Sequence, residues 1–280
     1  MQAYKESTAR VSPQKRAKEV EKIIKMAQSE KINAFGSLSC EVREVVVANS
    51  HGIFAYHPYT RSVLNIRMMG ENSTGYAGEI NLDFSKLQIE MAAQRAISKV
   101  AAGAKAIIEV RPWKWRADTP YEIILEEPAV SEMMTYMTYL GFGARSYHEE
   151  RSFMSGKLGQ KVTGENITIW DDAYNEQLLP MPFDYQGVPK KSVILIDKGI
   201  AKNILYDHYL GLKYGATPTG HGYPAPNTED AYATNLHLAP GATPKKDLIK
   251  GIKKGILVSR FWYVRNVHPK ELTITGMTRD

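Results

Sequence analysis

The chain has 280 residues, of which 43% are hydrophobic and 24% are charged, a composition typical of soluble globular proteins and unlike that of disordered ones. Thirty-six Lys and Arg residues outweigh 30 Asp and Glu residues, so the net charge is +6, spread along the chain. The longest apolar stretches, such as Val45–Ala48, are far shorter than the ~20 residues of a membrane-spanning helix. The first residues also lack the apolar core of a signal peptide. We therefore expect a cytoplasmic protein without a membrane segment.

A single cysteine, Cys40, excludes internal disulfides and any zinc or iron–sulfur site that needs several thiolates. Leu38, Cys40 and Val42 alternate with polar residues, as they do in a strand with one buried face. We therefore expect Cys40 to be a half-buried strand thiol.

The first half of the sequence predicts a helix, a meander of strands and a second helix. Ser12-Pro13 is a helix start, and apolar residues then recur at helical spacing to about Lys31. The turn Asn49–Gly52 favours a hairpin. The strands expected around and after this turn are Val42–Asn49, Ile53–His57, Ser62–Met69 and Tyr76–Ile80, followed by a helix over Phe84–Ala102.

The pattern breaks between Gly103 and Pro120, and we place a domain boundary there, with domains at residues 1–118 and 119–280. Trp113–Arg116 alternates aromatic and basic residues, which can stack on bases and contact phosphates. This short cluster lacks an extended basic groove, so we expect an interdomain connection and no nucleic-acid partner.

The second half predicts another mixture of strands and helices. A strand over Tyr121–Leu125 leads to a helix that begins at Glu126-Glu127-Pro128 and carries Met133, Met134 and Met137 on one face, a pattern typical of core packing. The later elements are strands over Ser192–Asp197 and Ile200–Leu205, a helix from Thr243-Pro244 to near Gly255, a strand over Ile256–Ser259 and a final aromatic strand. The predicted fold is α+β, with two domains of antiparallel or mixed sheet and packed helices.

The residues alone suggest no complete catalytic set. Phosphate-binding glycine loops and a nucleophile elbow are absent from the sequence. His148-Glu149 begins like a zinc-peptidase helix, but Ser152 and Phe153 stand where the second histidine belongs, so we interpret it as a surface pair. Asp171-Asp172 favours a turn after a strand. His208, His221 and His237 lie in one domain and converge on a metal only if the fold brings them together.

The segment Gly215–Pro226 is rich in glycine, proline and threonine. Such a loop exposes backbone donors and can form a surface that binds a peptide or a partner. An ordinary rigid turn region explains the same composition, and the sequence leaves both interpretations open.

Several blocks of the second half resemble the TldD/PmbA (TldE) metallopeptidase family in order along the chain. The matching blocks are Arg151–Val162, Asn166–Asp172, Pro182–Pro189, Thr217–Gly222, Thr234–Leu236 with Ala239–Gly241, Gly255–Tyr263 and Thr275–Asp280. The first half is similar to the family's middle region, more loosely, through Val47–His57 and Ser73–Gly78. The resemblance implies a chain that is short at both ends relative to the family, with an incomplete C-terminal domain.

The resemblance implies a cytosolic peptidase system in which TldD-type subunits carry a zinc-binding His-Glu-x-x-x-His helix and PmbA/TldE-type subunits do not. Counting back from Phe153 without a gap places Thr135 and Tyr136 at the His-Glu positions and Leu140 at the second histidine. None of these residues supplies an imidazole or a carboxylate base. The chain is therefore similar to the PmbA/TldE type, with no metal or cofactor of its own and zinc expected in a TldD-type partner.

The resemblance further implies a subunit that pairs with a TldD-like chain or a second copy and acts on peptides or unfolded proteins. We expect its substrate or partner contacts at Arg151, Ser155, Gly156 and Lys157, and at Thr219, Gly220 and His221. The alternative is a self-sufficient metallopeptidase with an atypical metal site drawn from His148, Glu149, His208 or His221.

Overall fold

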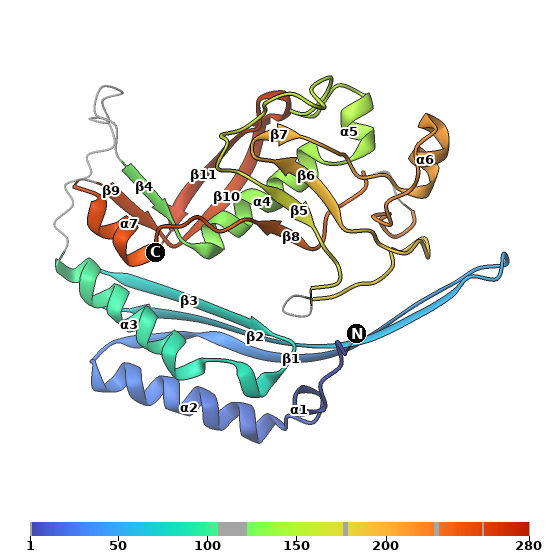
Figure 1. Cartoon of the computed structure of the whole chain (residues 1–280). Helices are drawn as coiled ribbons and strands as arrows, with labels where there is room; N and C mark the ends of the chain where they lie inside the picture. The colour runs from blue at the N-terminus through green and yellow to red at the C-terminus, as the bar shows by residue number, and fades with distance from the viewer. Residues whose placement is uncertain (1, 106–121, 176–178, 227–229, 254, 280) are drawn as a thin grey trace.

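The computed structural model describes residues 2–105, 122–175, 179–226, 230–253 and 255–279, which form two α+β units (Figure 1). A three-stranded antiparallel sheet in the N-terminal unit has two long helices on one face, and the C-terminal unit lies over its other face. The predicted α+β class is confirmed. The predicted boundary after residue 118 and the Trp113–Arg116 cluster lie outside the described residues.

The N-terminal unit follows the predicted order of helix, strands and helix. Its elements are α1 (Glu6–Ala9), α2 (Pro13–Ser29), β1 (Asn33–Ala48), β2 (Phe54–Met69), β3 (Thr74–Asn81), the 3-10 turn η1 (Phe84–Lys86) and α3 (Ile89–Lys105). The side chain of Ser12 accepts a hydrogen bond from the backbone N–H of Lys15, and Pro13 is the first helical residue, so the predicted start of α2 is confirmed.

One prediction in this unit is wrong: Ile53–His57 and Ser62–Met69 do not form separate strands but belong to one 16-residue strand, β2. Proline cannot donate to a strand ladder, yet β2 continues through Pro58. It lies in the part of β2 that has β1 on one side only, since β3 pairs with Ser62–Met69. Proline is tolerated there, and the strand continues.

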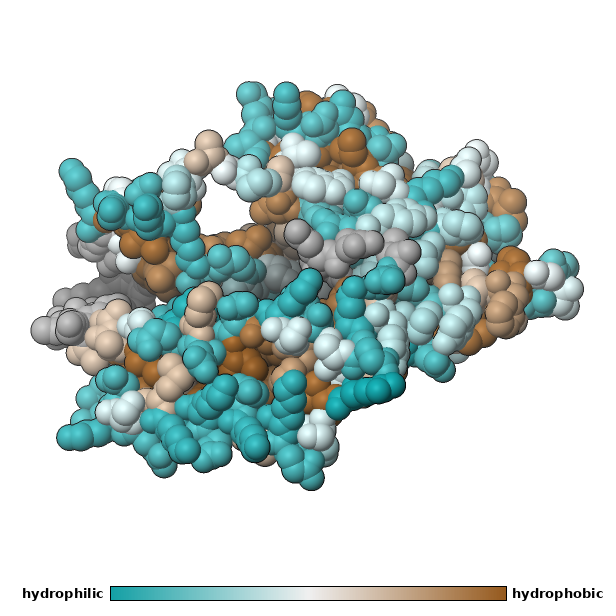
Figure 2. Space-filling model, turned by 60° about the horizontal axis from the view of Figure 1, so that its bottom comes forward, coloured by the Kyte–Doolittle hydropathy of each residue, from teal (hydrophilic) through white to brown (hydrophobic). Residues whose placement is uncertain are grey.

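The outer halves of β1 and β2 therefore form a two-stranded arm, residues 41–61, that projects beyond β3 (Figure 1). Burial along the arm alternates with the two-residue period of a strand. Val47 and Ile53 lie close to Gly187 of the C-terminal unit, while Phe54 (74% exposed) and its neighbours Val46 and Tyr56 face outward. Figure 2 shows brown and tan side chains near this end of the molecule, beside a mostly hydrophilic helical face.

The core of the N-terminal unit lies between the sheet and its helices. Ile23 of α2, Leu64 and Met68 of β2, and Ala96 of α3 are all buried in it. Cys40 packs half-buried against this core, and its Sγ lies 3.6 Å from Ser62 Oγ, which confirms the strand thiol predicted from the sequence.

The C-terminal unit contains shorter strands in three small sheets. Its elements are β4 (Glu122–Leu125), α4 (Glu127–Gly141), α5 (Ala144–His148), β5 (Ile169–Asp171), β6 (Val193–Asp197), β7 (Ile200–Ala201), α6 (His208–Tyr214), β8 (Leu236–Leu238), α7 (Lys245–Gly251), β9 (Gly255–Val258), β10 (Arg260–His268), η3 (Pro269–Glu271) and β11 (Thr273–Arg279). The main sheet has the antiparallel order β7-β6-β5-β8, β4 pairs in parallel with β9, and β10 pairs with β11. The strand predicted over Ile200–Leu205 is shorter than expected, and the final strand is a hairpin.

The two units are joined by a buried charge cluster around Glu126, the residue before α4. Lys99 of α3 donates hydrogen bonds to the Glu126 carboxylate, to the Tyr76 carbonyl at 2.7 Å and to Ser259 Oγ at 2.9 Å. Ser259 Oγ donates to the same carboxylate at 2.7 Å, and Lys245 Nζ lies 3.0 Å from its second oxygen. Glu126 is only 7% exposed, so its charge depends on these partners.

The pKa of Glu126 shows that the cluster favours the charged carboxylate. Burial alone raises this pKa, but the hydrogen bonds from Lys99, Ser259 and Lys245 outweigh burial and hold it at about 2, below the ordinary value of 4.5. A lowered pKa in the folded state means that charged Glu126 stabilises the fold fully above pH 4.5, and that this stabilisation is lost as the pH falls through about 2.

We predict that Glu126→Gln lowers the free energy of unfolding by about 3 kcal/mol at pH 7, because Lys99 and Lys245 lose their buried anion. The difference from the wild type should shrink between pH 4.5 and about 2, since wild-type Glu126 becomes protonated there. Urea denaturation at several pH values measures both effects.

The control is Glu127→Gln, which removes an exposed carboxylate paired with the same Lys245 and should lower the free energy of unfolding by less than about 1 kcal/mol. Equal effects of the two variants would contradict the prediction.

Candidate functional site

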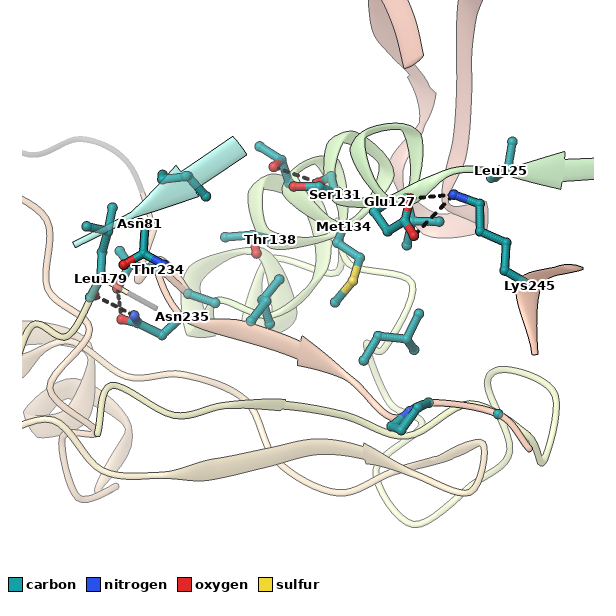
Figure 3. A pocket seen from close by; sticks show the side chains of 18 of the residues that line it. Asn81, Leu125, Glu127, Ser131, Met134, Thr138, Leu179, Thr234, Asn235 and Lys245 are labelled. Atoms are coloured by element: carbon teal, nitrogen blue, oxygen red, sulfur yellow. Dashed lines mark hydrogen bonds and ion pairs between the residues drawn. The ribbon is translucent and has the colours of Figure 1, made fainter. Parts of the chain in front are cut away.

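A cleft of about 890 Å³ lies between the two units. Its walls come from the end of β3, from α4, from β8 and from the segment that leads to α7 (Figure 3). The lining is mainly apolar, with Ile80, Leu125, Met134, Leu236 and Leu248 among its residues. The cleft is large enough for a small organic ligand or several residues of an extended peptide.

One face of α4 forms the helical wall of this cleft. Glu127, Ser131, Met134, Thr135 and Thr138 line it at intervals of three and four residues, which is the spacing of a single helix face. Figure 3 shows Met134 reaching from α4 toward β8. Thr138 is 1% exposed, and its hydroxyl has no hydrogen-bond partner among the residues that the structure describes. Buried polar groups without a partner are rare, because they lose their hydrogen bonds to water.

The three residues that the family resemblance places at the zinc-motif positions, Thr135, Tyr136 and Leu140, lie on α4. Thr135 borders the cleft, and its hydroxyl donates to the Ser131 carbonyl at 2.9 Å. The Tyr136 hydroxyl donates to the Val264 carbonyl of β10 at 2.6 Å, on another side of the helix. Leu140 offers no ligand atom. These three residues do not fit a zinc ion, whose protein ligands are imidazoles, thiolates and carboxylates.

The histidines do not supply a metal site by another route, because the described parts of the chain contain no group of three His, Cys, Asp or Glu side chains that could hold an ion. The prediction that His148 and Glu149 form a surface pair is wrong for His148. Its ring is half-buried, stacks on Tyr214 with 3.6 Å between centroids and lies 3.0 Å from the Tyr206 hydroxyl. Glu149 is exposed and pairs with Arg151. His237 stacks on Trp170, and His208 is exposed.

The Thr217–Gly222 loop is anchored by a buried histidine–aspartate pair. His221 Nε2 lies 3.0 Å from Asp171 Oδ1, and His221 Nδ1 lies 3.0 Å from Thr219 Oγ1. A carboxylate only accepts hydrogen bonds, so Nε2 carries the proton in this pair. Burial raises the pKa of Asp171, but the bond from His221, with the charge of Lys190 and the N–H of Asn235, gives a net lowering.

These three residues have the composition of a catalytic triad, but the contacts of Thr219 are structural. Its hydroxyl accepts a hydrogen bond from the Tyr206 N–H at 2.9 Å and lies 3.0 Å from the Tyr206 carbonyl, so the backbone holds it on two sides. A triad nucleophile must be free to attack a substrate. Asp171, which the sequence placed in a turn, instead ends β5 and ties this loop to the sheet, while Asp172 caps the turn that follows.

The predicted loop packs closely against a buried lysine. Gly220 has a φ of +77°, and a Cβ atom there would lie 2.6 Å from the Cα of Lys190. Only glycine allows this backbone conformation together with this close approach. The Lys190 ammonium donates to Thr234 Oγ1, and the Thr234 hydroxyl donates to Asn235 Oδ1 at 2.8 Å. Thr234 and Asn235 also line the cleft, so the loop supports the floor of the candidate site.

Comparison with known protein families agrees with this arrangement of two units. The PmbA/TldA metallopeptidase central domain matches residues 6–102, and the PmbA/TldA metallopeptidase C-terminal domain matches residues 118–280. The chain belongs to the PmbA/TldA metallopeptidase family.

Individual relatives extend this family match. An uncharacterized protein of Methanocaldococcus jannaschii is 29% identical over 189 residues, which are 66% of this chain and 42% of that protein. The metalloprotease PmbA homolog of Haemophilus influenzae is 26% identical over 183 residues, 63% of this chain and 39% of the homolog. The chain thus spans about two fifths of the length of these relatives. The crystal structure of TldE from Thermococcus kodakarensis has the same fold, with a TM-score of 0.71 and 22% identity over 95% of this chain and 61% of TldE.

The other predicted contact residues of this PmbA/TldA chain lie away from the cleft. Arg151, Ser155, Gly156 and Lys157 do not line it. Arg151 pairs with exposed Glu149, the Ser155 hydroxyl donates to the Tyr147 carbonyl at 2.9 Å, and Gly156 occupies a turn with a φ of +69°. Their role in binding a substrate or a partner stays a prediction.

Sequence reasoning missed Lys190, Thr234 and Asp184 as site residues. Asp184-x-x-Gly187 has the pattern of a turn, and its carboxylate indeed accepts from the N–H groups of Gln186 and Val188. No local pattern distinguishes Lys190 from exposed Lys191 beside it, because the burial of Lys190 depends on the loop around Gly220 and on Thr234, 44 positions later in the chain.

We predict that Gly220→Ala destabilises the protein more than Gly215→Ala does. Both glycines have positive φ, so each alanine costs about 1–2 kcal/mol of left-handed strain. A Cβ at Gly215 meets nothing within 4 Å, whereas one at Gly220 meets the Lys190 backbone and adds about 1–3 kcal/mol of overpacking. Thermal denaturation of the two variants measures the difference. Equal melting temperatures would contradict the close approach of Gly220 to the Lys190 backbone.

Proposed function

We propose that this chain is a non-catalytic subunit of the PmbA/TldE type, which pairs in the cytosol with a zinc-carrying TldD-type subunit and helps to process or degrade peptides and unfolded proteins. The observation that carries the proposal is the zinc-motif region of α4. Thr135, Tyr136 and Leu140 stand at its three positions, and both hydroxyl groups donate to backbone carbonyls. Zinc chemistry in the complex then belongs to the partner.

The cleft supports a role in binding peptides. Two sheet edges border it, because β3 is the last strand of the β1-β2-β3 sheet and β8 is the last strand of the β7-β6-β5-β8 sheet. An edge strand presents unpaired N–H and C=O groups that can pair with an extended chain whatever its sequence. The apolar lining residues, such as Ile80, Met134 and Leu236, can cover the side chains of such a peptide.

The two-stranded arm supports pairing with a second subunit. Val46, Phe54 and Tyr56 expose a continuous apolar face, since Val46 and Tyr56 lie opposite each other and Phe54 pairs with Ala48. Exposed apolar faces of this kind mark protein interfaces. We propose that a TldD-type subunit, or a second copy of this chain, covers the arm. None of the described helices is long and apolar enough to cross a membrane.

The first prediction concerns the metal content of the purified chain. We expect much less than one zinc per chain after dialysis, because the motif positions supply no ligand. Elemental analysis per mole of protein measures this. The proposal would be contradicted if each chain held one zinc tightly and showed peptidase activity that a chelator removes. The chain would then be a self-sufficient metallopeptidase. Single substitutions of His148, His208 and His221 would locate its zinc ligands.

The second prediction concerns the complex. Mixed with a TldD-type subunit, the chain should form a complex that cleaves unstructured peptides faster than the TldD-type subunit alone, because the cleft adds binding surface. Thr135→Tyr fills the cleft and should lower cleavage several-fold, while Glu132→Tyr, on a helix position that does not line the cleft, should not. Size-exclusion chromatography checks that both variants still associate.

The arm provides the matched test of association. The double variant with Val46→Ser and Phe54→Ser removes exposed apolar surface and should weaken complex formation without lowering the melting temperature of the chain alone. If the complex cleaves peptides no faster than the TldD-type subunit alone, the proposed function fails.

A further inference from the structure

A second, smaller pocket opens beside the cleft. It has a volume of about 160 Å³, and it shares the lining residues Leu179, Tyr232 and Thr234 with the cleft. Figure 3 shows Leu179 and Thr234 next to each other at this end of the cleft. Its remaining wall includes four aromatic residues, Tyr59, Phe183, Tyr185 and Tyr223, together with polar Asp184, Lys190 and His221. We call it the side pocket.

Lys190 lines the side pocket and is only 4% exposed. A lysine ammonium has three N–H donors. One of them is used by Thr234 Oγ1, and the described residues offer no hydrogen-bond acceptor to the other two. Burial lowers the pKa of Lys190, and the attraction of Asp171 and Asp184 opposes this shift.

The two neighbouring aspartates are occupied by other donors. Asp171 accepts hydrogen bonds from His221 Nε2 and from the Asn235 N–H. Asp184 accepts from three backbone N–H groups, those of Gln186, Val188 and Gly222. These five N–H donors offset the negative charge of the pair, and neither aspartate makes a direct ion pair with Lys190 among the residues that the structure describes. The ammonium therefore retains two donors for a ligand.

We propose that the side pocket is a subsite for a carboxylate group of the peptide that lies in the cleft, either the side chain of an acidic residue or the C-terminal carboxylate. Two carboxylate oxygens can accept the two free N–H groups of Lys190 in charge-assisted hydrogen bonds. Lys190 itself is buried, and a low local dielectric strengthens such bonds. The aromatic walls can cover the methylene groups next to the carboxylate. This inference rests on the proposed peptide-binding role and adds to it a preference for one chemical group.

The test uses the complete chain and three fluorescent peptides of the same length. The first has a free C-terminus and no acidic residue, the second has an amidated C-terminus and one internal Glu, and the third has an amidated C-terminus with Gln in place of that Glu. Fluorescence anisotropy at constant salt gives the three dissociation constants. We expect at least one carboxylate-bearing peptide to bind about ten- to a hundredfold more tightly than the third, as a charged hydrogen bond allows.

The preferred peptide identifies the source of the carboxylate, and either preference supports the subsite. Lys190→Met should abolish the preference, because methionine fills similar space without a charge. Lys191→Met removes the same charge from the exposed neighbouring residue and should preserve it. If Lys190→Met does not fold, the exposed control decides: a preference kept in Lys191→Met supports the subsite, and a preference lost in Lys191→Met overturns it.

The outcomes separate the two proposals. Equal binding of the three peptides to the wild type overturns the subsite and leaves the peptide-binding role in place. The subsite is also overturned if the preference for carboxylate-bearing peptides survives Lys190→Met and disappears in Lys191→Met. The exposed charge of Lys191 then explains the preference. If none of the peptides binds, with or without the TldD-type subunit, the proposed function fails and the subsite fails with it.

Discussion

The buried carboxylate of Glu126 joins segments of both units next to the cleft. It receives Lys99 from α3, Ser259 from the turn between β9 and β10, and Lys245 from the start of α7, while Glu126 itself begins α4. Four segments from both units thus meet at one anion. Because removing a partner from a buried ion pair leaves an uncompensated charge, these segments cannot move apart independently. The start of α4 and the start of α7 also line the cleft, so this anion holds two of its walls relative to each other.

Helix α4 connects the Glu126 charge cluster to the candidate site, and its different faces make different contacts. One face, from Ser131 to Thr138, borders the cleft. Another face holds Tyr136, which bonds to β10, and Met137, which packs against the C-terminal core. A helix that carried zinc ligands at positions 135, 136 and 140 would have to direct them toward one ion. Here Tyr136 instead fastens the helix to β10, Thr135 donates to the Ser131 carbonyl of the same helix, and Leu140 has no ligand atom.

Local patterns predicted the elements of the fold well and the site poorly. The start of α2 at Ser12-Pro13, the turn at Asn49–Gly52 and the half-buried Cys40 all follow from signals a few residues long. The continuity of β2 through Pro58 was missed, because it depends on where β3 ends. The side pocket depends on contacts between distant segments: Gly220 lies on the backbone of Lys190, and Lys190 reaches Thr234. No short pattern contains that information, although the family resemblance did mark the loop.

The polar groups beneath the cleft show why this region is organised for binding rather than for stability alone. Burying Asp171, Asp184, Lys190 and His221 costs desolvation energy, and apolar residues of similar volume would often be at least as stable. Three of these groups are satisfied by neighbours, and Lys190 is satisfied only in part. A protein that needed only a rigid floor could have placed an apolar side chain at position 190. The partly satisfied lysine, at the junction of an apolar cleft and an aromatic pocket, is best explained by a ligand that completes its hydrogen bonds.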